Sequence, residues 1–199
     1  LPHFKPSVLD TLREPLESRQ ISISRASGRA RFPASFQLLA AMNPCPAGLV
    51  CSESSCRCRP DQVRRYQGRI SGPLLDRIDL HVAVGEVPKE LLLSDTSGPS
   101  DGELGHEEVA RARQRQLQRQ GQLNAFLAMP ALNAHVALGT EEKRILSRAS
   151  DRYRLSARGF HRVLRVARSV ADMEGEVRVG PRQLVEALGY RAMEWIAGR

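Results

Sequence analysis

The spacing of apolar residues changes along the first part of the chain. From Val8 to Leu16 they recur at helical spacing, which predicts a helix that Pro15 should kink or shorten. From Gln20 to Phe32 they alternate with polar residues, and a central Ser27-Gly28 pair can form a tight turn. We therefore expect a short helix followed by a β-hairpin.

Two further segments predict strands. Phe36–Met42 is a nearly continuous apolar run, as in a buried parallel strand, and Ile78–Val84 alternates apolar with polar residues. Between them, Pro60–Arg69 indicates a helix with a proline at an early position. This part of the chain therefore predicts an incomplete α/β layer with parallel strands and an inserted hairpin.

The rest of the chain predicts helices. The clearest begins after Ser156 and has apolar residues along one face from Phe160 to Ala171. Its opposite face carries four arginines: Arg158, Arg162, Arg165 and Arg168. The arginine-rich stretch Glu107–Arg119 is typical of a solvated helix face, and Gly180-Pro181 can open a last helix. We expect an all-α domain here.

A segment of turn-forming residues separates the two parts. Residues 89–105 are rich in Ser, Gly, Pro and Asp, show no apolar periodicity, and set one lysine against four acidic residues. We expect residues 1–88 to form the α/β part, residues 89–105 a linker, and residues 106–199 the helical domain.

The chain is basic, and its charge is concentrated. The formal charge is +8, and between Gln20 and Ile70 eight arginines stand against two acidic residues. This balance favours a polyanionic partner. No apolar run is long enough to span a bilayer, and the amino terminus lacks the pattern of a signal peptide. We therefore expect a cytoplasmic protein without a membrane partner.

Two polar residues stand at the ends of predicted segments. Asn43 follows Phe36–Met42, where α/β sheets bind ligands, so its amide could orient a water against a phosphate. The alternative is a loop asparagine that simply starts a turn before Pro44. Arg77 precedes the second strand and suits either a structural ion pair or a cation presented to a neighbouring subunit's phosphate. The residues themselves leave these alternatives open.

All four cysteines lie in one short segment. Cys45, Cys51, Cys56 and Cys58 follow the pattern C-x5-C-x4-C-x-C. Four thiolates can complete a tetrahedral Zn²⁺ shell, and a cytosolic compartment disfavours disulfides. The spacing differs from the usual pair of C-x-x-C knuckles, so a zinc site, free thiols and a disulfide all remain open.

Three stretches carry a resemblance: Ala40–Pro46 (AAMNPCP), Ser71–Leu80 (SGPLLDRIDL) and Leu155–Arg168 (LSARGFHRVLRVAR). Together and in this order they resemble the magnesium-chelatase-like branch of the AAA+ ATPases, and within it the ComM and YifB family. The resemblance implies that residues 1–88 are the carboxyl-terminal part of an AAA+ P-loop core. Residues 106–199 would then be its helical lid.

The resemblance also implies roles for single residues. Asn43 would be the sensor-1 residue at the γ-phosphate of ATP, Arg77 the arginine finger reaching the adjacent subunit, and Arg158 the sensor-2 residue. The hairpin would face the channel of a ring, with three arginines on the DNA backbone: Arg25, Arg29 and Arg31. The implied protein is a DNA branch-migration helicase of recombination or natural transformation, a hexameric ring that uses ATP and Mg²⁺.

Two motifs of such ATPases are missing from the sequence. It has no G-x-x-x-x-G-K-[ST] loop and no apolar run ending in paired acids to hold Mg²⁺. In the family, Leu-Pro-x-Phe directly follows those acids, and here Leu1–Phe4 opens the chain. We therefore expect this chain to begin downstream of the nucleotide-binding half and not to hydrolyse ATP by itself.

Two alternatives stand beside the motor. One is a non-catalytic, zinc-ordered module that binds nucleic acid. The other is a subunit like the motor of magnesium chelatase, which loads Mg²⁺ into a porphyrin. The cysteine segment and the basic hairpin argue against that second alternative.

Overall fold

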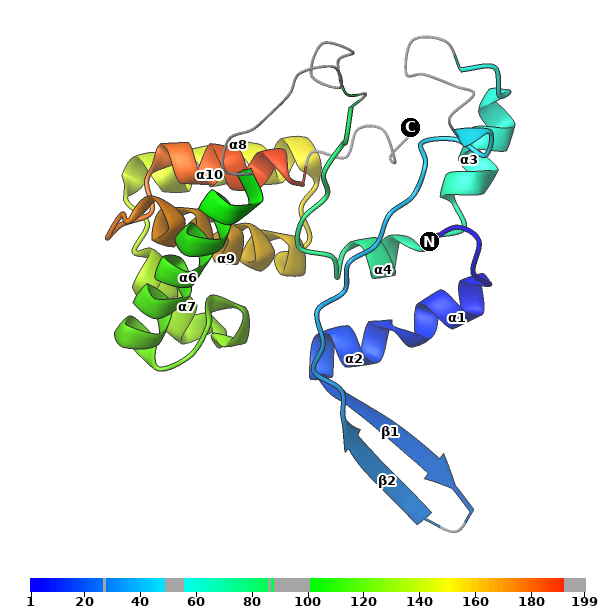
Figure 1. Ribbon diagram of the computed structural model, residues 1–199, viewed down its shortest axis with the longest axis horizontal. Coiled ribbons are helices and arrows are strands. Elements are labelled where there is room, and N and C mark those ends of the chain that lie inside the picture. Colours follow the sequence, from blue (N-terminus) through cyan, green and yellow to red (C-terminus); the bar gives the residue numbers. More distant parts are fainter. Residues whose placement is uncertain (27, 49–55, 86, 88–100, 192–199) are drawn as a thin grey trace. The chain divides into compact units, whose positions relative to one another are not determined.

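The computed structural model describes residues 1–26, 28–48, 56–85, 87 and 101–191. They form a mixed α/β structure in which helices predominate (Figure 1). One compact unit comprises Leu1–Ile78, and a second begins at Asp79. Most of the predicted linker, residues 89–100, lies outside the described residues.

The first unit begins with two short helices. α1 (Pro6–Thr11) and α2 (Arg13–Ser18) replace the single helix predicted over this stretch, and Leu12 separates them. Pro15 lies in the first turn of α2, where its missing N–H needs no partner within the helix. The proline thus splits the predicted helix rather than bending it.

Two more helices complete the apolar centre of this unit, α3 (Pro60–Gln67) and α4 (Gly72–Leu75). Leu9, Ile70 and Leu74 are buried together. The Ser71 hydroxyl accepts a hydrogen bond from the Leu74 N–H (3.3 Å), which caps α4, and donates one to the Asp10 carboxylate of α1 (2.7 Å). The start of α4 is therefore fixed against α1.

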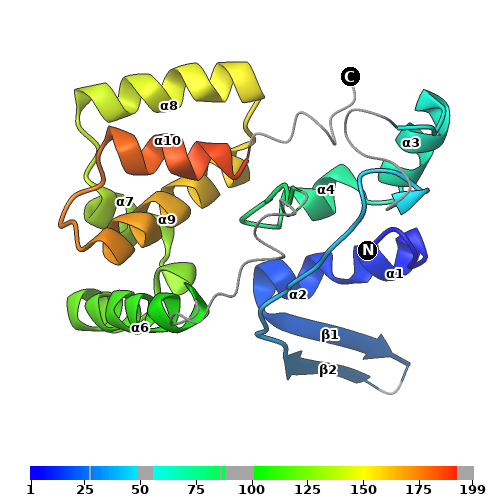
Figure 2. The same ribbon diagram turned by 45° about the horizontal axis from the view of Figure 1, so that its top comes forward.

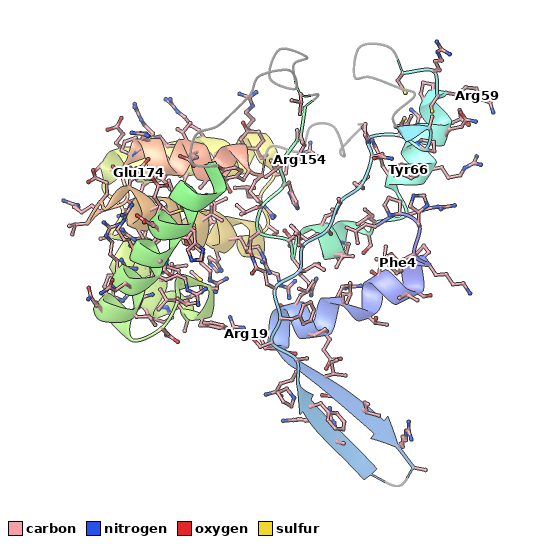
Figure 3. All side chains as sticks on the ribbon, in the orientation of Figure 1. Phe4, Arg19, Arg59, Tyr66, Arg154 and Glu174 are labelled. Carbon is pink, nitrogen blue, oxygen red and sulfur yellow. The ribbon has the colours of Figure 1, made fainter. Side chains whose placement is uncertain are left out.

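The predicted hairpin is confirmed. β1 (Gln20–Arg25) and β2 (Gly28–Pro33) pair antiparallel and extend away from the helices of their unit (Figures 1 and 2). Arg19, labelled in Figure 3, joins α2 to β1 with a left-handed φ of 58°, and its carbonyl accepts the N–H of Ala34 (2.8 Å). Ser27 of the predicted turn lies outside the described residues.

The two predicted parallel strands do not form. Within the described residues β1 and β2 make the only sheet, and segments 36–42 and 78–84 carry no strand. A strand is held by hydrogen bonds to a neighbour, and the described chain places no strand beside either segment. Apolar side chains of these segments are exposed instead, Leu39 by 96% and Val84 by 89%. The α/β layer is thus represented by one two-stranded antiparallel sheet.

The segment after Asp79 finds its partners on helices of the second unit. The Asp79 carboxylate is ion-paired with Arg162 of α9 (Ala157–Glu174). The N–H of His81 donates to the carbonyl of Tyr190, at the end of α10 (Pro181–Gly189), over 2.9 Å. These contacts explain why the segment lies with the helices although its pattern is that of a strand.

The second unit is helical, as its sequence predicted. Besides α9 and α10 it contains α6 (Asp101–Gln120), the 3-10 turn η2 (Asn124–Phe126), α7 (Met129–Val136) and α8 (Thr140–Tyr153). α9 packs against α6, α7 and α10, and α10 lies between α8 and α9 (Figure 2). Among the described helices, none combines the length and apolar character needed to cross a membrane.

Candidate functional site

Asn43 lies at the start of a tight turn. The N–H of Gly48 donates to the Cys45 carbonyl (3.2 Å), and Gly48 has a left-handed φ of +60°. A methyl group at Gly48 would lie 2.6 Å from Nδ2 of Asn43, so the Asn43 amide rests directly on this glycine. Nε2 of Gln67 in α3 donates to the Pro44 carbonyl (2.9 Å). The turn is therefore attached to α3, and exposed Asn43 is positioned with it.

Three of the four cysteines converge beside this turn. The sulfur atoms of Cys45, Cys56 and Cys58 lie within 4.8 Å of one another, and none is bonded to another. Cys45 is buried, Cys58 is half-buried and Cys56 is exposed. Cys51, the fourth cysteine of the predicted group, lies outside the described residues. The cluster thus brings together three soft metal ligands.

Arg77 follows α4 and is held by its own unit. One terminal nitrogen donates to the carboxylate of Glu17 in α2, and the other donates to the Pro73 carbonyl (2.8 Å). Only 9% of the Arg77 side chain is exposed. In this structure Arg77 therefore forms the ion pair that its sequence context left open as one alternative.

The register of the hairpin places two of its arginines on one face. Residues directly opposite in antiparallel strands project from the same side, so Ser22 lies with Arg31 and Ser24 with Arg29. Arg29 and Arg31 are both exposed and stand two residues apart on β2, roughly 7 Å along the strand. We call this side, made by these four residues, the basic face.

The other side of the hairpin is apolar. It carries Ile21, Ile23, Ala30 and Phe32. Arg25 lies opposite Gly28 at the turn end and starts from this apolar side. The three arginines that the resemblance groups together are therefore divided between two faces.

Arg158 belongs to the second unit. It is exposed in the first turn of α9, where the Ser156 hydroxyl accepts the N–H of Gly159 (3.0 Å) and fixes the helix start. A guanidinium beside a helix amino terminus suits an anionic ligand. Asn43 and Arg77 both lie in the first unit, so the three proposed nucleotide residues are contributed by two units.

A buried charged network lies in the second unit, and the sequence pattern did not predict it. Arg168 is fully buried, so its placement among the exposed arginines of α9 is wrong. Its guanidinium donates to Asp172 one turn later (3.0 Å). Asp172 also accepts from both terminal nitrogens of Arg119 in α6 and from Nδ2 of Asn124 (2.8 Å). Because the Arg119 guanidinium is bound to the Asp172 carboxylate, α6 does not present all its arginines to solvent.

The network shifts the protonation of its members. Burial by itself would raise the pKa of Asp172, but hydrogen bonds from Arg119 and Asn124 and the charge of Arg168 hold that pKa below its ordinary value. Burial lowers the pKa of Arg168, although Asp172 opposes this. The sequence feature that could have indicated the burial of Arg168 is its position four residues after Leu164, which places it on the apolar stripe of the helix.

Comparison with known proteins covers both parts of the chain. Residues 1–92 match the family model described as magnesium chelatase, subunit ChlI, and residues 102–191 match the model of the ChlI C-terminal region. The chain is 42% identical over 193 residues to competence protein ComM of Haemophilus influenzae. It is 40% identical over 195 residues to the uncharacterized protein YifB of Escherichia coli.

The coverage of these alignments is unequal. They take in 97% and 98% of this chain but 38% of each relative. A relative from Mycobacterium tuberculosis gives a similar result, 38% identity over 189 residues and 37% of its own length. The chain thus spans less than two fifths of the length of the curated relatives it matches.

Proposed function

Because the chain belongs to the magnesium chelatase family, as its motifs predicted, we propose that it is part of an ATP-driven motor that acts on DNA. The motor would be a hexameric, cytoplasmic ring that moves DNA branches during recombination or natural transformation. The name of the relative competence protein ComM supports this direction. This chain would supply the DNA-facing hairpin and three residues of the nucleotide sites.

The observation that carries the DNA partner is the basic face of the hairpin. Its two arginines, Arg29 and Arg31, project from the same side of β2 because one residue separates them. Ser24 and Ser22 lie directly opposite them on β1. Arginine and serine donate to phosphate oxygens, and such contacts hold nucleic acid without reading its sequence. Charge on one side of a projecting hairpin is the arrangement expected of an element that follows a phosphate backbone.

The nucleotide sites are the second part of the proposal. Asn43 would orient the attacking water, Arg77 would reach the ATP of the adjacent subunit, and Arg158 would couple the helical unit to the nucleotide. The 199 residues contain no G-x-x-x-x-G-K-[ST] (Walker A) loop. ATP and Mg²⁺ would therefore be held by other residues of a protein as long as the relatives.

The test of the DNA partner compares the two faces of the hairpin. Affinity of the 199-residue chain for a DNA duplex is measured by fluorescence anisotropy over a series of salt concentrations. Because each phosphate contact contributes about 0.9 to the slope of log affinity against log salt, Arg29→Glu with Arg31→Glu should flatten that slope by about 2. Circular dichroism checks that the double variant keeps its fold.

The matched control is Arg25→Glu, which makes the same change of charge on the same hairpin but on the apolar side. We expect it to change the slope less than either substitution on the basic face. An unchanged slope in the double variant would remove the hairpin from the DNA interface.

A second candidate is a non-catalytic module that binds nucleic acid. The cysteine cluster, whose three sulfur atoms could bind an ordering metal ion, favours it. ATP turnover of the native protein separates the two: turnover stimulated by DNA supports the motor, and DNA binding without turnover supports the module. The basic face disfavours a role in loading Mg²⁺ into a porphyrin, because a porphyrin substrate needs no phosphate-binding surface.

A further inference from the structure

We propose that Cys45, Cys56 and Cys58 hold a structural Zn²⁺ ion that clamps the turn carrying Asn43 to the start of α3. The three sulfur atoms lie within 4.8 Å of one another. With zinc–sulfur bonds of about 2.3 Å, tetrahedral geometry separates the sulfur atoms by roughly 3.8 Å, so a small inward movement brings all three onto one ion. This inference does not depend on the DNA motor.

The local backbone explains why these sulfur atoms converge. Residues 56–58 lie in no helix or strand, and Cys58 stands two residues before α3. The C-x-C pattern keeps Cys56 and Cys58 close along the chain, so both sulfur atoms can lie beside that of Cys45. On the other side, the turn from Cys45 to Gly48 is closed by its own hydrogen bond. The turn at Cys45 is therefore closed by the backbone itself, without a contribution from a bound ion.

The number of thiols favours a metal over a disulfide. A disulfide uses two sulfur atoms and would leave the third beside it as an unpaired thiol. Thiolates are soft ligands that select Zn²⁺ over Mg²⁺ or Ca²⁺, and each thiol releases its proton to the solvent when it binds. The fourth position of the tetrahedron stays available to a further ligand or to water.

The position of the cluster gives the ion a structural role. Cys45 is 2% exposed and lies two residues after Asn43, whereas Cys58 lies two residues before α3. Figure 3 shows Arg59 and Tyr66 at this helix, which the Gln67–Pro44 hydrogen bond already joins to the turn. A bound ion adds a second link between the same two segments, so it would hold Asn43 in a fixed place relative to α3.

The first test measures metal on the unmodified chain. We expect about one equivalent of zinc on the 199-residue chain purified without chelator. Added Co²⁺ alone, after zinc removal, should give the visible absorption of tetrahedral cobalt with sulfur-to-cobalt charge transfer. Less than about half an equivalent after incubation with Zn²⁺, or a cobalt spectrum without charge transfer from sulfur, would overturn the proposal.

The second test identifies the ligands. Cys45→Ser and Cys58→Ser should each lose the ion and the cobalt charge-transfer bands. Arg57→Ala, placed between two of the ligands, is the matched control and should keep both. Retention of the ion by both serine variants would overturn the assignment. If a serine variant fails to fold, the zinc content and cobalt spectrum of the unmodified chain still decide whether a thiolate site exists.

Discussion

Arg77 is ion-paired with Glu17, sixty residues earlier in the chain. The pair joins the chain just after α4 to α2, and the second terminal nitrogen of Arg77 donates to the Pro73 carbonyl of α4 (2.8 Å). The residue proposed as an arginine finger is thus held by an acid of its own unit. To reach a neighbouring nucleotide it would have to exchange Glu17 for phosphate.

We predict that Glu17→Gln destabilises the chain by about 1–2 kcal/mol. The reason is that Arg77 would keep its mostly buried charge and lose the carboxylate that compensates it. Because the Glu17 side chain is 41% exposed, the loss should be smaller than for a fully buried pair. Urea unfolding followed by circular dichroism measures it.

The control for this prediction is Asp61→Asn. Its partner Arg59 lies 3.8 Å away, and both side chains are largely exposed, so its removal should cost less than about 0.5 kcal/mol. Equal losses in the two variants would mean that the Arg77–Glu17 pair contributes no more than a surface contact.

ATP turnover distinguishes a finger from a purely structural Arg77. In the protein that contains this chain together with its nucleotide-binding loop, Arg77→Ala should lower turnover by about 10³-fold or more. Glu17→Gln keeps the guanidinium and should retain most turnover although it weakens the same ion pair. Near-normal turnover of Arg77→Ala, or parallel losses in both variants, would contradict the finger.

The low pKa of Asp172 predicts how stability depends on pH. A carboxyl whose pKa is lower in the folded state stabilises the protein above its unfolded pKa of about 3.9, and this contribution is lost as pH falls through the folded value. At pH 7, Asp172→Asn should cost about 3–5 kcal/mol, because it leaves Arg168 buried without its carboxylate.

The difference between Asp172→Asn and the unmodified chain should therefore narrow under acid, as the unmodified carboxyl becomes protonated. Urea unfolding at neutral and acidic pH measures this. Glu107→Gln, which removes an exposed partner of Arg111, is the control and should show almost no difference at either pH. A difference for Asp172→Asn that does not change with pH would show that its charge does not matter.

Gly48→Ala should disturb the turn that carries Asn43. Its φ of +60° strains any residue with a Cβ atom, and the new methyl group would meet Nδ2 of Asn43 at 2.6 Å. We expect a cost of about 1–2 kcal/mol and a shift of the Asn43 side-chain amide resonances in NMR spectra. Gly72→Ala is the control, since open space surrounds that position. Unshifted Asn43 resonances in Gly48→Ala would contradict the contact.

Features set by nearby residues could be predicted from the sequence. The hairpin follows from alternation with a central glycine, and α9 follows from its apolar stripe after a serine cap. The break between α1 and α2 was harder to predict, because a proline can either occupy the first turn of a new helix or bend a continuous one. The family, too, was recognisable from three short motifs.

Features that depend on distant partners could not be predicted. Segment 36–42 has the composition of a buried strand, yet composition does not supply the neighbouring strand that would make it one. Arg168 lies on the apolar stripe of α9. Its charge can be buried there because its guanidinium donates hydrogen bonds to oxygen atoms of Asp172, Glu176 and Val177. The cysteine pattern likewise did not show which sulfur atoms lie together, whereas the structure places those of Cys45, Cys56 and Cys58 within 4.8 Å of one another.

Segment 36–42, which has no neighbouring strand among the described residues, has a consequence for hydrogen exchange. Its backbone amides donate to no described backbone acceptor, so they should exchange with solvent deuterium almost as fast as those of an unfolded peptide. The amides of α9 should exchange far more slowly. If a strand pairs with one edge of this segment, every second amide of the segment donates to that strand and becomes protected from exchange. Their exchange rates would therefore record, residue by residue, how far a sheet has been completed.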